Sequence, residues 1–200
     1  MADEKTLKQT IINIGKKIYD LRLVAAHSGN LSARLNENEI LITATGTSLG
    51  NLKEDEIIRV DLSRVLDKNK ERLSSEFPLH RLIYQNFPAK AVIHCHPPLI
   101  NGYFAVFSDI KALTFETRLY LGNVPVVIQE TPAISQPEPV IAALKNNNLA
   151  VIKNHGVVAM GQDFNQALGL IEMLEEAVKV AAIARIFKKE ALDEMDTALK

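Results

Sequence analysis

The stretch from residue 91 to residue 97 reads Ala-Val-Ile-His-Cys-His-Pro and indicates a buried β-strand that closes at the proline. Side chains two positions apart leave the same face of a strand, so His94 and His96 are expected side by side. Cys95 then points to the opposite face, where we expect a small buried residue and not a ligand. Two adjacent imidazoles suit zinc or a similar divalent ion. The alternative is a pair of polar histidines that caps a strand near the surface.

Short runs rich in β-branched residues lie on both sides of this stretch and predict further strands. They cover Glu39–Thr45, Ile57–Leu62, Val124–Gln129 and Leu149–Met160. We expect the last run to form two strands that break near Asn154-His155-Gly156, because glycine relieves the backbone where the chain must bend.

Apolar residues at helical spacing predict amphipathic helices near both ends of the chain. The first helix, near residues 5–23, has its stripe at Leu7, Ile11, Ile14, Ile18 and Leu21. The second has its stripe at Ala167, Ile171, Leu174, Val178 and Ala181, with Asp163 as N-cap. Serines and Pro78 predict a shorter helix from Ser75 or Glu76 to about Asn86, and another follows Gln136-Pro137.

Strands and helices mix here without strict alternation, which favours a layered α/β domain with a mixed or largely antiparallel sheet. A Rossmann fold is disfavoured, because no Gly-x-Gly-x-x-Gly motif follows a predicted strand. The sequence contains no internal repeat, low-complexity tract or linker, so we expect a single domain over residues 1–200.

The composition excludes several classes of protein. The sequence has 23 lysines and arginines and 24 aspartates and glutamates. It therefore has no excess of positive charge that would indicate nucleic acid as the main partner. Apolar runs fall short of the ~18–20 residues of a membrane span, and the amino terminus does not resemble a signal peptide. The single cysteine excludes an intrachain disulfide and fits a reducing compartment, so we expect a cytoplasmic protein.

A third histidine, His155, follows the apolar run that begins at Leu149. Gly156 removes a side chain at the turn and leaves His155 free to reach sideways. Three imidazoles with one open position are typical of catalytic zinc, whereas a lone loop histidine is more often simply hydrogen-bonded. His27 and His80 carry less weight, and we expect His80 to pack on its helix instead of serving as a ligand.

Glu76, at the presumed helix start, has two readings. A carboxylate there is favoured by the helix dipole, and it is also suited to act as a general base beside a metal. Two small-residue clusters, Ser28–Ser32 and Thr43–Ser48, together with Ser74-Ser75, resemble neutral anion cradles, although such residues also dominate ordinary turns.

The order of these motifs resembles that of the class II aldolase/adducin family. The motifs are Ser28-Gly-Asn-Leu-Ser32, Thr45-Gly46, Ser74-Ser-Glu76, His94-x-His96 and Asn154-His155-Gly156. The chain is most similar to the L-fuculose-1-phosphate aldolase branch of this family, and the similarity runs from about Leu7 to Ile186.

The resemblance implies a fold, a site and a reaction. The fold is a three-layer α/β/α sandwich around a largely antiparallel sheet, in a homotetramer with active sites between subunits. Zinc, or another divalent metal, would bind His94, His96 and His155, and Glu76 would act as acid and base and approach the metal in the empty site. The substrate phosphate would bind Gly29, Asn30, Thr45, Gly46, Ser74 and Ser75. The reaction is cleavage of a ketose 1-phosphate into dihydroxyacetone phosphate and an aldehyde through a metal-stabilised enediolate.

Two departures from the aldolase pattern leave alternatives open. Phe115 or Glu116 stands nearest to a tyrosine that these aldolases use across the subunit interface, and no aromatic residue follows Phe187. Sister enzymes on the same scaffold are methylthioribulose-1-phosphate dehydratases and L-ribulose-5-phosphate 4-epimerases. A non-catalytic adducin-like binding domain is a further alternative, against which the complete set of histidines and Glu76 speaks.

Overall fold

A computed structural model of the chain describes residues 3–63, 72–129, 134 and 136–198, with side chains up to Lys188. Its centre is a seven-stranded sheet in the order β3-β2-β1-β4-β7-β6-β5, in which every neighbouring pair is antiparallel except β5 and β6. The strands are β1 (Asn30–Arg34), β2 (Glu39–Thr43), β3 (Ile57–Asp61), β4 (Ala91–Cys95), β5 (Val126–Val127), β6 (Leu149–Ile152) and β7 (Gly156–Gly161). The predicted largely antiparallel sheet is therefore confirmed.

Strand β4 is the middle strand, and all five of its residues are buried. Ala91, Ile93 and Cys95 belong to the core on one face of the sheet. Val92 belongs to the core on the other face, and His94 alternates with it. Because both faces are covered, the strand is apolar at nearly every position instead of alternating with polar residues.

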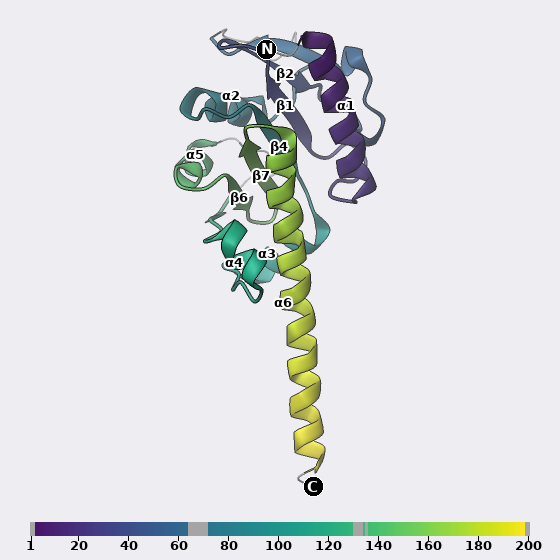
Figure 1. The fold of residues 1–200 in the computed structure, drawn as a ribbon, viewed down its shortest axis with the longest axis vertical. Helices are drawn as coiled ribbons and strands as arrows, with labels where there is room; N and C mark the ends of the chain where they lie inside the picture. The colour runs from purple at the N-terminus through teal and green to yellow at the C-terminus, as the bar shows by residue number, and fades with distance from the viewer. Residues whose placement is uncertain (1–2, 64–71, 130–133, 135, 199–200) are drawn as a thin grey trace.

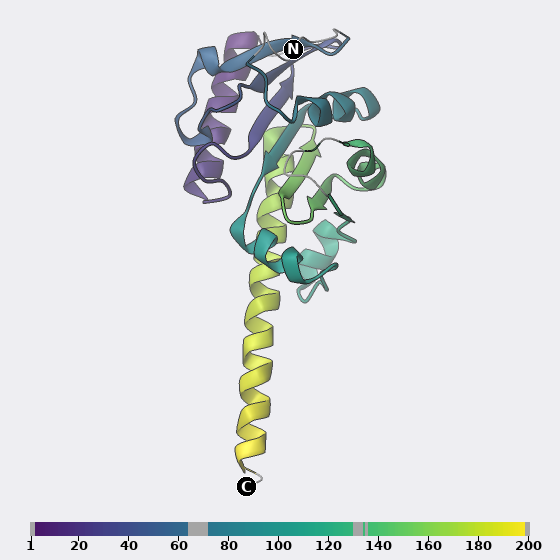
Figure 2. The same cartoon turned by 180° about the vertical axis from the view of Figure 1, so that it is seen from behind.

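Helices cover both faces of the sheet and give the predicted three layers (Figure 1). The first face carries α1 (Glu4–Asp20), α3 (Pro98–Val106) and α6 (Phe164–Ala198). The second face carries α2 (Phe77–Asn86) and α5 (Glu138–Leu144), which lie together on one side in the view from behind (Figure 2). Helix α4 (Phe115–Leu121) packs against α6, and two 3-10 turns, Leu49–Asn51 and Glu54–Glu56, precede β3.

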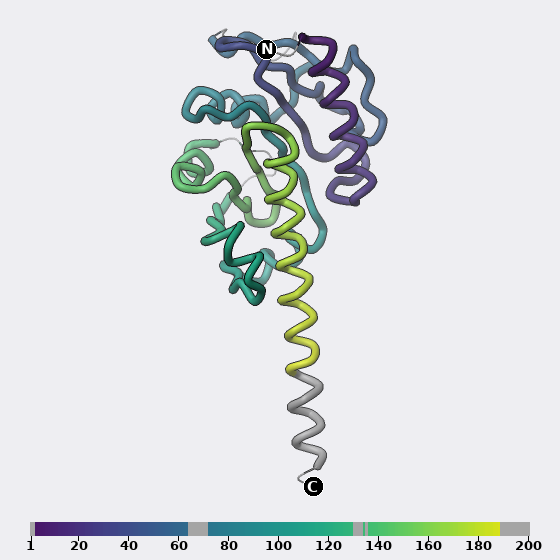
Figure 3. Tube along the Cα trace, in the orientation of Figure 1, coloured from purple at the N-terminus to yellow at the C-terminus, as the bar shows by residue number. Residues whose placement is uncertain are grey.

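The two terminal helices follow the predicted apolar stripes except at Leu21, which is the C-cap residue after α1 and is 43% exposed. Asp3 caps α1 by accepting a hydrogen bond from the Thr6 N–H at 3.1 Å, and α1 ends before Arg22, which has a positive φ of 59°. Asp163 caps α6 as predicted, since its carboxylate accepts from the Gln166 N–H at 2.8 Å. Before residue 188, α6 already runs past α3 and α4 (Figure 3).

Several element predictions needed correction. The run Val124–Gln129 forms only the short strand β5, and β1 and the helices α3 and α4 were not predicted. Strand β1 was missed because Ser28–Ser32 was interpreted as a turn, although Asn30 to Ser32 already belong to the sheet. Helix α2 begins at Phe77, one or two residues later than predicted, and no serine side chain caps it as N-cap residue. Among the described helices, none has both the length and the apolarity needed to span a bilayer.

Candidate active site

The three predicted histidines meet at one end of the central strands. His94 is in β4, His96 follows β4 directly, and His155 lies in the loop between β6 and β7. The His94 Nε2 atom lies 2.9 Å from His96 Nε2 and 3.1 Å from His155 Nε2. These three residues can hold a metal ion, because their ligand atoms all lie within 4.8 Å of one another.

The β6–β7 hairpin brings His155 to this point. Asn154 takes a positive φ of 62°, a conformation that asparagine tolerates better than most residues, and it turns the chain back toward β4. A side chain at Gly156 would lie 2.8 Å from the His96 ring and still closer to the Cys95 carbonyl oxygen. Glycine is therefore required here for the hairpin to approach the end of β4.

We expect Gly156→Ala to separate His155 from the other two histidines. The added methyl group must displace the Cys95 carbonyl or the His96 ring, at a cost of about 1–3 kcal/mol in folding free energy. Thermal unfolding and metal titration measure the two effects. Gly169→Ala is the matched control, since a side chain at Gly169 meets nothing within 4 Å. An unchanged melting temperature and metal affinity in Gly156→Ala would contradict the close approach.

The chemistry of this donor set fits a divalent cation. The His94 Nδ1–H donates to the Val157 carbonyl at 2.9 Å, which leaves Nε2 turned toward the other groups. Burial, together with His94 and His155, lowers the pKa of His96 to about 3, which keeps the His96 ring neutral near pH 7. Lone pairs that converge at this distance repel each other unless a cation lies between them.

Glu76 lies against the histidines although it is far from them in sequence. Its Oε2 is 2.9 Å from His94 Nε2 and its Oε1 is 2.9 Å from His155 Nε2. It is the residue before α2, but its side chain turns to the histidines and does not cap the helix. Burial acts to raise the pKa of Glu76, yet His94, His155 and Asn30 outweigh it and leave the pKa well below its usual range.

All six residues that were predicted to hold phosphate line one cavity of about 220 Å³ beside the histidines. The described lining contains no lysine or arginine, so an anion there would rely on hydroxyls, amides and the start of α2. The complete lining is His27, Ser28, Gly29, Asn30, Ala44, Thr45, Gly46, Ser74, Ser75, Glu76, His96 and His155.

Several features of this cavity were not predicted. His27 joins its wall beside Ser28, which belongs to the predicted cluster Ser28–Ser32 and whose hydroxyl already bonds to the backbone of Ala25 at 2.7 and 3.0 Å. The Ser74 hydroxyl accepts from the Glu76 N–H at 3.2 Å, and Asn30 donates from Nδ2 to Glu76 Oε2 at 2.9 Å. The signal for His27 was its place beside the predicted small-residue cluster, whereas the Asn30–Glu76 contact has no local signal.

The structure also confirms two predicted placements, those of Cys95 and His80. Cys95 is buried in the core on the face opposite to His94, and burial raises the pKa of its thiol. His80 is fully buried within α2 and does not join the other three histidines. Burial lowers the pKa of His80 to about 3.

Comparison with known proteins places this site in a family. The model of the class II aldolase and adducin N-terminal domain matches residues 9–182. The chain belongs to the class II aldolase and adducin family. Within the family, an L-fuculose phosphate aldolase from Methanocaldococcus jannaschii is 33% identical over 184 residues, which cover 91% of this chain and 99% of the relative.

Other relatives in the family differ in their named reaction. A 3-oxo-tetronate 4-phosphate decarboxylase from Haemophilus influenzae is 30% identical over 181 residues, or 86% of this chain and 85% of that protein. The crystal structure of an L-fuculose-1-phosphate aldolase from Thermus thermophilus has a TM-score of 0.83 and 26% identity, and the match covers 92% of this chain and 98% of that one.

Proposed function

We propose that this protein is a zinc-dependent aldolase that cleaves a ketose 1-phosphate similar to L-fuculose 1-phosphate into dihydroxyacetone phosphate and an aldehyde. The observation that carries the proposal is the position of Glu76. Its carboxylate lies 2.9 Å from two of the three clustered histidines and also lines the cavity that contains the six residues predicted to hold phosphate. A base, a metal-binding group and an anion site thus meet within the reach of one small sugar phosphate.

Each part of the site has a task in this proposal. His94, His96 and His155 would hold the zinc ion, which when bound supplies a Lewis acid that draws electron density from the substrate carbonyl. Thr45 and Gly46 from one wall, and Ser74 and Ser75 from another, would bind the phosphate together with Gly29 and Asn30. Binding at the phosphate then fixes the reacting carbons beside Glu76.

Glu76 would move the proton that the reaction requires. As the bond between C3 and C4 breaks, the C4 hydroxyl gives up its proton and becomes the aldehyde oxygen. The electron pair of the broken bond stays on C3 of the three-carbon fragment, where a proton must be added to give dihydroxyacetone phosphate. Glu76 is buried and held by Asn30, so its carboxylate is fixed in place before substrate arrives. The reverse step removes the same proton.

Proton exchange into dihydroxyacetone phosphate tests this proposal without knowledge of the aldehyde. We expect metal-loaded protein in D2O to replace one carbon-bound hydrogen of dihydroxyacetone phosphate with deuterium, as followed by proton NMR. A chelator should stop the exchange, and added zinc should restore it. A folded, metal-loaded sample without exchange would contradict the aldolase and favour the dehydratase or the epimerase.

A second candidate function is decarboxylation of a 3-oxo acid phosphate. It is favoured by the relative named for this reaction, and by Phe115 or Glu116 at the place where the family's aldolases use tyrosine. Loss of carbon dioxide from a 3-oxo-tetronate 4-phosphate leaves the same three-carbon fragment, and protonation again gives dihydroxyacetone phosphate. Decarboxylation does not require a proton donor for an aldehyde oxygen, so it can proceed without that tyrosine.

Exchange into dihydroxyacetone phosphate is expected from both reactions, so a second measurement separates them. An aldolase consumes dihydroxyacetone phosphate when lactaldehyde or glycolaldehyde is added, and it forms a new sugar phosphate. A decarboxylase instead releases carbon dioxide from 3-oxo-tetronate 4-phosphate and forms no condensation product. Carbon dioxide release without condensation would replace the aldolase with the decarboxylase.

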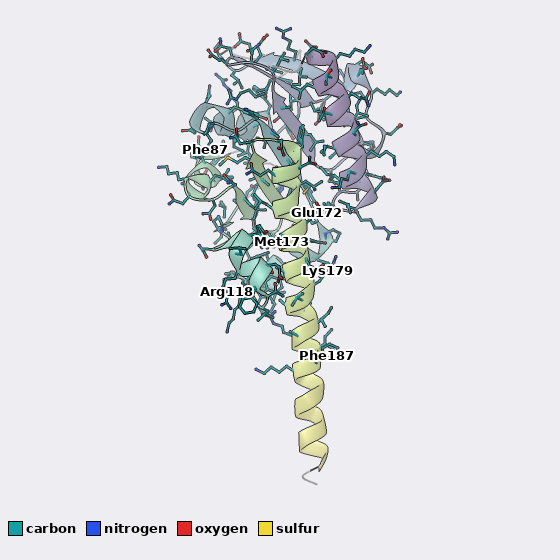
Figure 4. All side chains as sticks on the ribbon, viewed as in Figure 1. Phe87, Arg118, Glu172, Met173, Lys179 and Phe187 are labelled. Atoms are coloured by element: carbon teal, nitrogen blue, oxygen red, sulfur yellow. The ribbon has the colours of Figure 1, made fainter. Side chains whose placement is uncertain are left out.

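We also propose that the protein is a cytoplasmic homotetramer. Large apolar side chains of α3, α4 and α6 are exposed, and Figure 4 labels one of them, Phe187, on the part of α6 that runs past the sheet. Phe115 is 84% exposed, Leu119 77% and Phe187 64%. Exposed apolar groups of this extent favour contact with another subunit. The free, buried thiol of Cys95 agrees with a reducing compartment.

Changing this apolar surface is expected to dissociate the assembly. The double variant Leu119→Glu and Phe187→Glu places charges where other apolar groups would be buried, which association does not tolerate. Light scattering should then give the mass of one chain, against four chains for the unchanged protein. The control Asn51→Glu adds a charge to an exposed turn elsewhere and should leave the mass unchanged. A double variant that remains tetrameric would exclude this surface from the interface.

A further inference from the structure

Behind Glu76, a line of hydrogen-bonded side chains runs into the core between β1 and α2. Asn30 Nδ2 lies 2.9 Å from Glu76 Oε2, and Asn30 Oδ1 lies 2.6 Å from His80 Nε2. On the other side of the ring, His80 Nδ1 lies 2.5 Å from the Ser32 hydroxyl, which lies 2.9 Å from the Tyr84 hydroxyl. All five side chains are buried, so each of these bonds is shielded from water.

The positions of these residues follow from the fold. Asn30 and Ser32 alternate with core residues along β1 and therefore face α2, and Asn30 lies opposite His94 on the neighbouring strand. His80 is one helical turn after Glu76, so both point to the same side of α2. The line thus joins the floor of the cavity to the layer between helix and sheet.

The carboxylate of Glu76 gives the line one direction. A carboxylate only accepts hydrogen bonds, so Asn30 must present its NH2 group to Glu76 and its oxygen to His80. The hydrogen of a neutral His80 ring is then on Nε2, and Nδ1 accepts from the Ser32 hydroxyl. Ser32 in turn accepts from Tyr84. Each hydrogen bond of the line then has one donor and one acceptor.

We propose that His80 is a positioning residue for Glu76, acting through Asn30. An amide can rotate by half a turn, which would set the Asn30 oxygen against the Glu76 carboxylate and push the carboxylate away. The Nε2–H of His80 opposes this rotation, because turning the amide would also require the His80 hydrogen to move to Nδ1 and the Ser32 and Tyr84 hydroxyls to turn. Glu76 Oε2 then stays on Asn30 while Oε1 stays beside His155. The proposal rests on the proposed function, in which Glu76 carries the proton.

A pair of amide variants separates positioning from simple structural support. In His80→Gln, the side-chain nitrogen reaches the place of Nε2 and can donate to Asn30, whereas the shorter side chain of His80→Asn cannot reach it. We expect His80→Asn to lower kcat for exchange into dihydroxyacetone phosphate by roughly 10–100-fold with little change in KM, while His80→Gln regains most of the rate. Metal content should stay at the level of the unchanged protein in both variants.

The control Ile83→Ala removes a fully buried side chain of α2 outside the line. It should lower the melting temperature but leave kcat per folded, metal-loaded site unchanged. A purely structural His80 would give the same result in His80→Asn, and that outcome would overturn the proposal. So would a loss of metal in His80→Asn, since His80 would then support the histidines and not Glu76.

A measurement on the unchanged protein tests the line independently of turnover and of variants that fold poorly. Nitrogen-15 NMR of the histidine rings reports which nitrogen carries the hydrogen. We expect a neutral His80 with hydrogen on Nε2, and hydrogen on Nδ1 would overturn the assigned direction. Absence of exchange activity in the unchanged protein would instead refute the proposed function, and the NMR result would still decide the direction of the line.

Discussion

His96→Ala is expected to release the metal and abolish turnover. His96 is one of three imidazoles around a shared point, and its Nε2 is 2.9 Å from that of His94. Alanine would leave only two imidazoles, whereas catalytic zinc sites use three protein ligands, and Glu76 is assigned here to proton transfer instead of the ion. The loss of metal affinity and of turnover should exceed the roughly 10–100-fold loss that follows removal of a group that only supports a ligand. Metal analysis after dialysis and the exchange rate in D2O measure both effects.

His27→Ala is a matched control for the metal content of His96→Ala. His27 also lines the cavity, but it is outside the group of three histidines that can hold an ion. This variant should keep its metal after the same dialysis. If His96→Ala also kept full metal and full turnover, the assignment of His96 as a ligand would be wrong.

Glu76→Gln is expected to keep the metal and to slow proton transfer by about 100-fold or more. Glutamine has nearly the same shape as glutamate, and its oxygen can still accept from Asn30, so the side chain should stay in place. The amide cannot take up the proton that the carboxylate carries. The three histidines remain to hold the ion. Metal analysis should therefore give an unchanged metal content, whereas the rate of deuterium exchange should be much reduced.

A carboxylate elsewhere provides the comparison for Glu76→Gln. Glu176 lies on α6 in an exposed ion pair with Lys179, and Glu176→Gln should exchange at the rate of the unchanged protein. Exchange at the normal rate in Glu76→Gln would remove Glu76 from the mechanism. Loss of metal in that variant would instead make Glu76 a necessary ligand.

Local patterns in the sequence were enough to predict several parts of the site. The spacing of His94 and His96 in an apolar run predicted that both rings share one face of a strand, because strand geometry depends only on neighbouring residues. The glycine after His155 likewise predicted the turn that frees this ring. The apolar stripes of the terminal helices and the cap at Asp163 could be predicted because helix spacing and capping also depend only on neighbouring residues.

Other parts depended on contacts between distant segments. Glu76 had two readings in the sequence, as a residue favoured by the helix dipole or as a base beside a metal. The structure decides its position, because α2 packs on the face of the sheet that carries His94, and this brings the carboxylate to His155 across 79 positions of sequence. Strand β1 was hidden because its polar residues Asn30 and Ser32 are buried against α2, where hydrogen bonds replace apolar contacts.

The sequence by itself therefore determined which chemical groups are present and which neighbours share a face. Only the tertiary structure decided which oxygen of Glu76 meets Asn30 and which meets His155. It also decided that His80 lies behind Asn30, outside the lining of the cavity. The physical reason is that hydrogen-bond partners are chosen by the packing of α2 on the sheet, which no local repeat of residue types encodes.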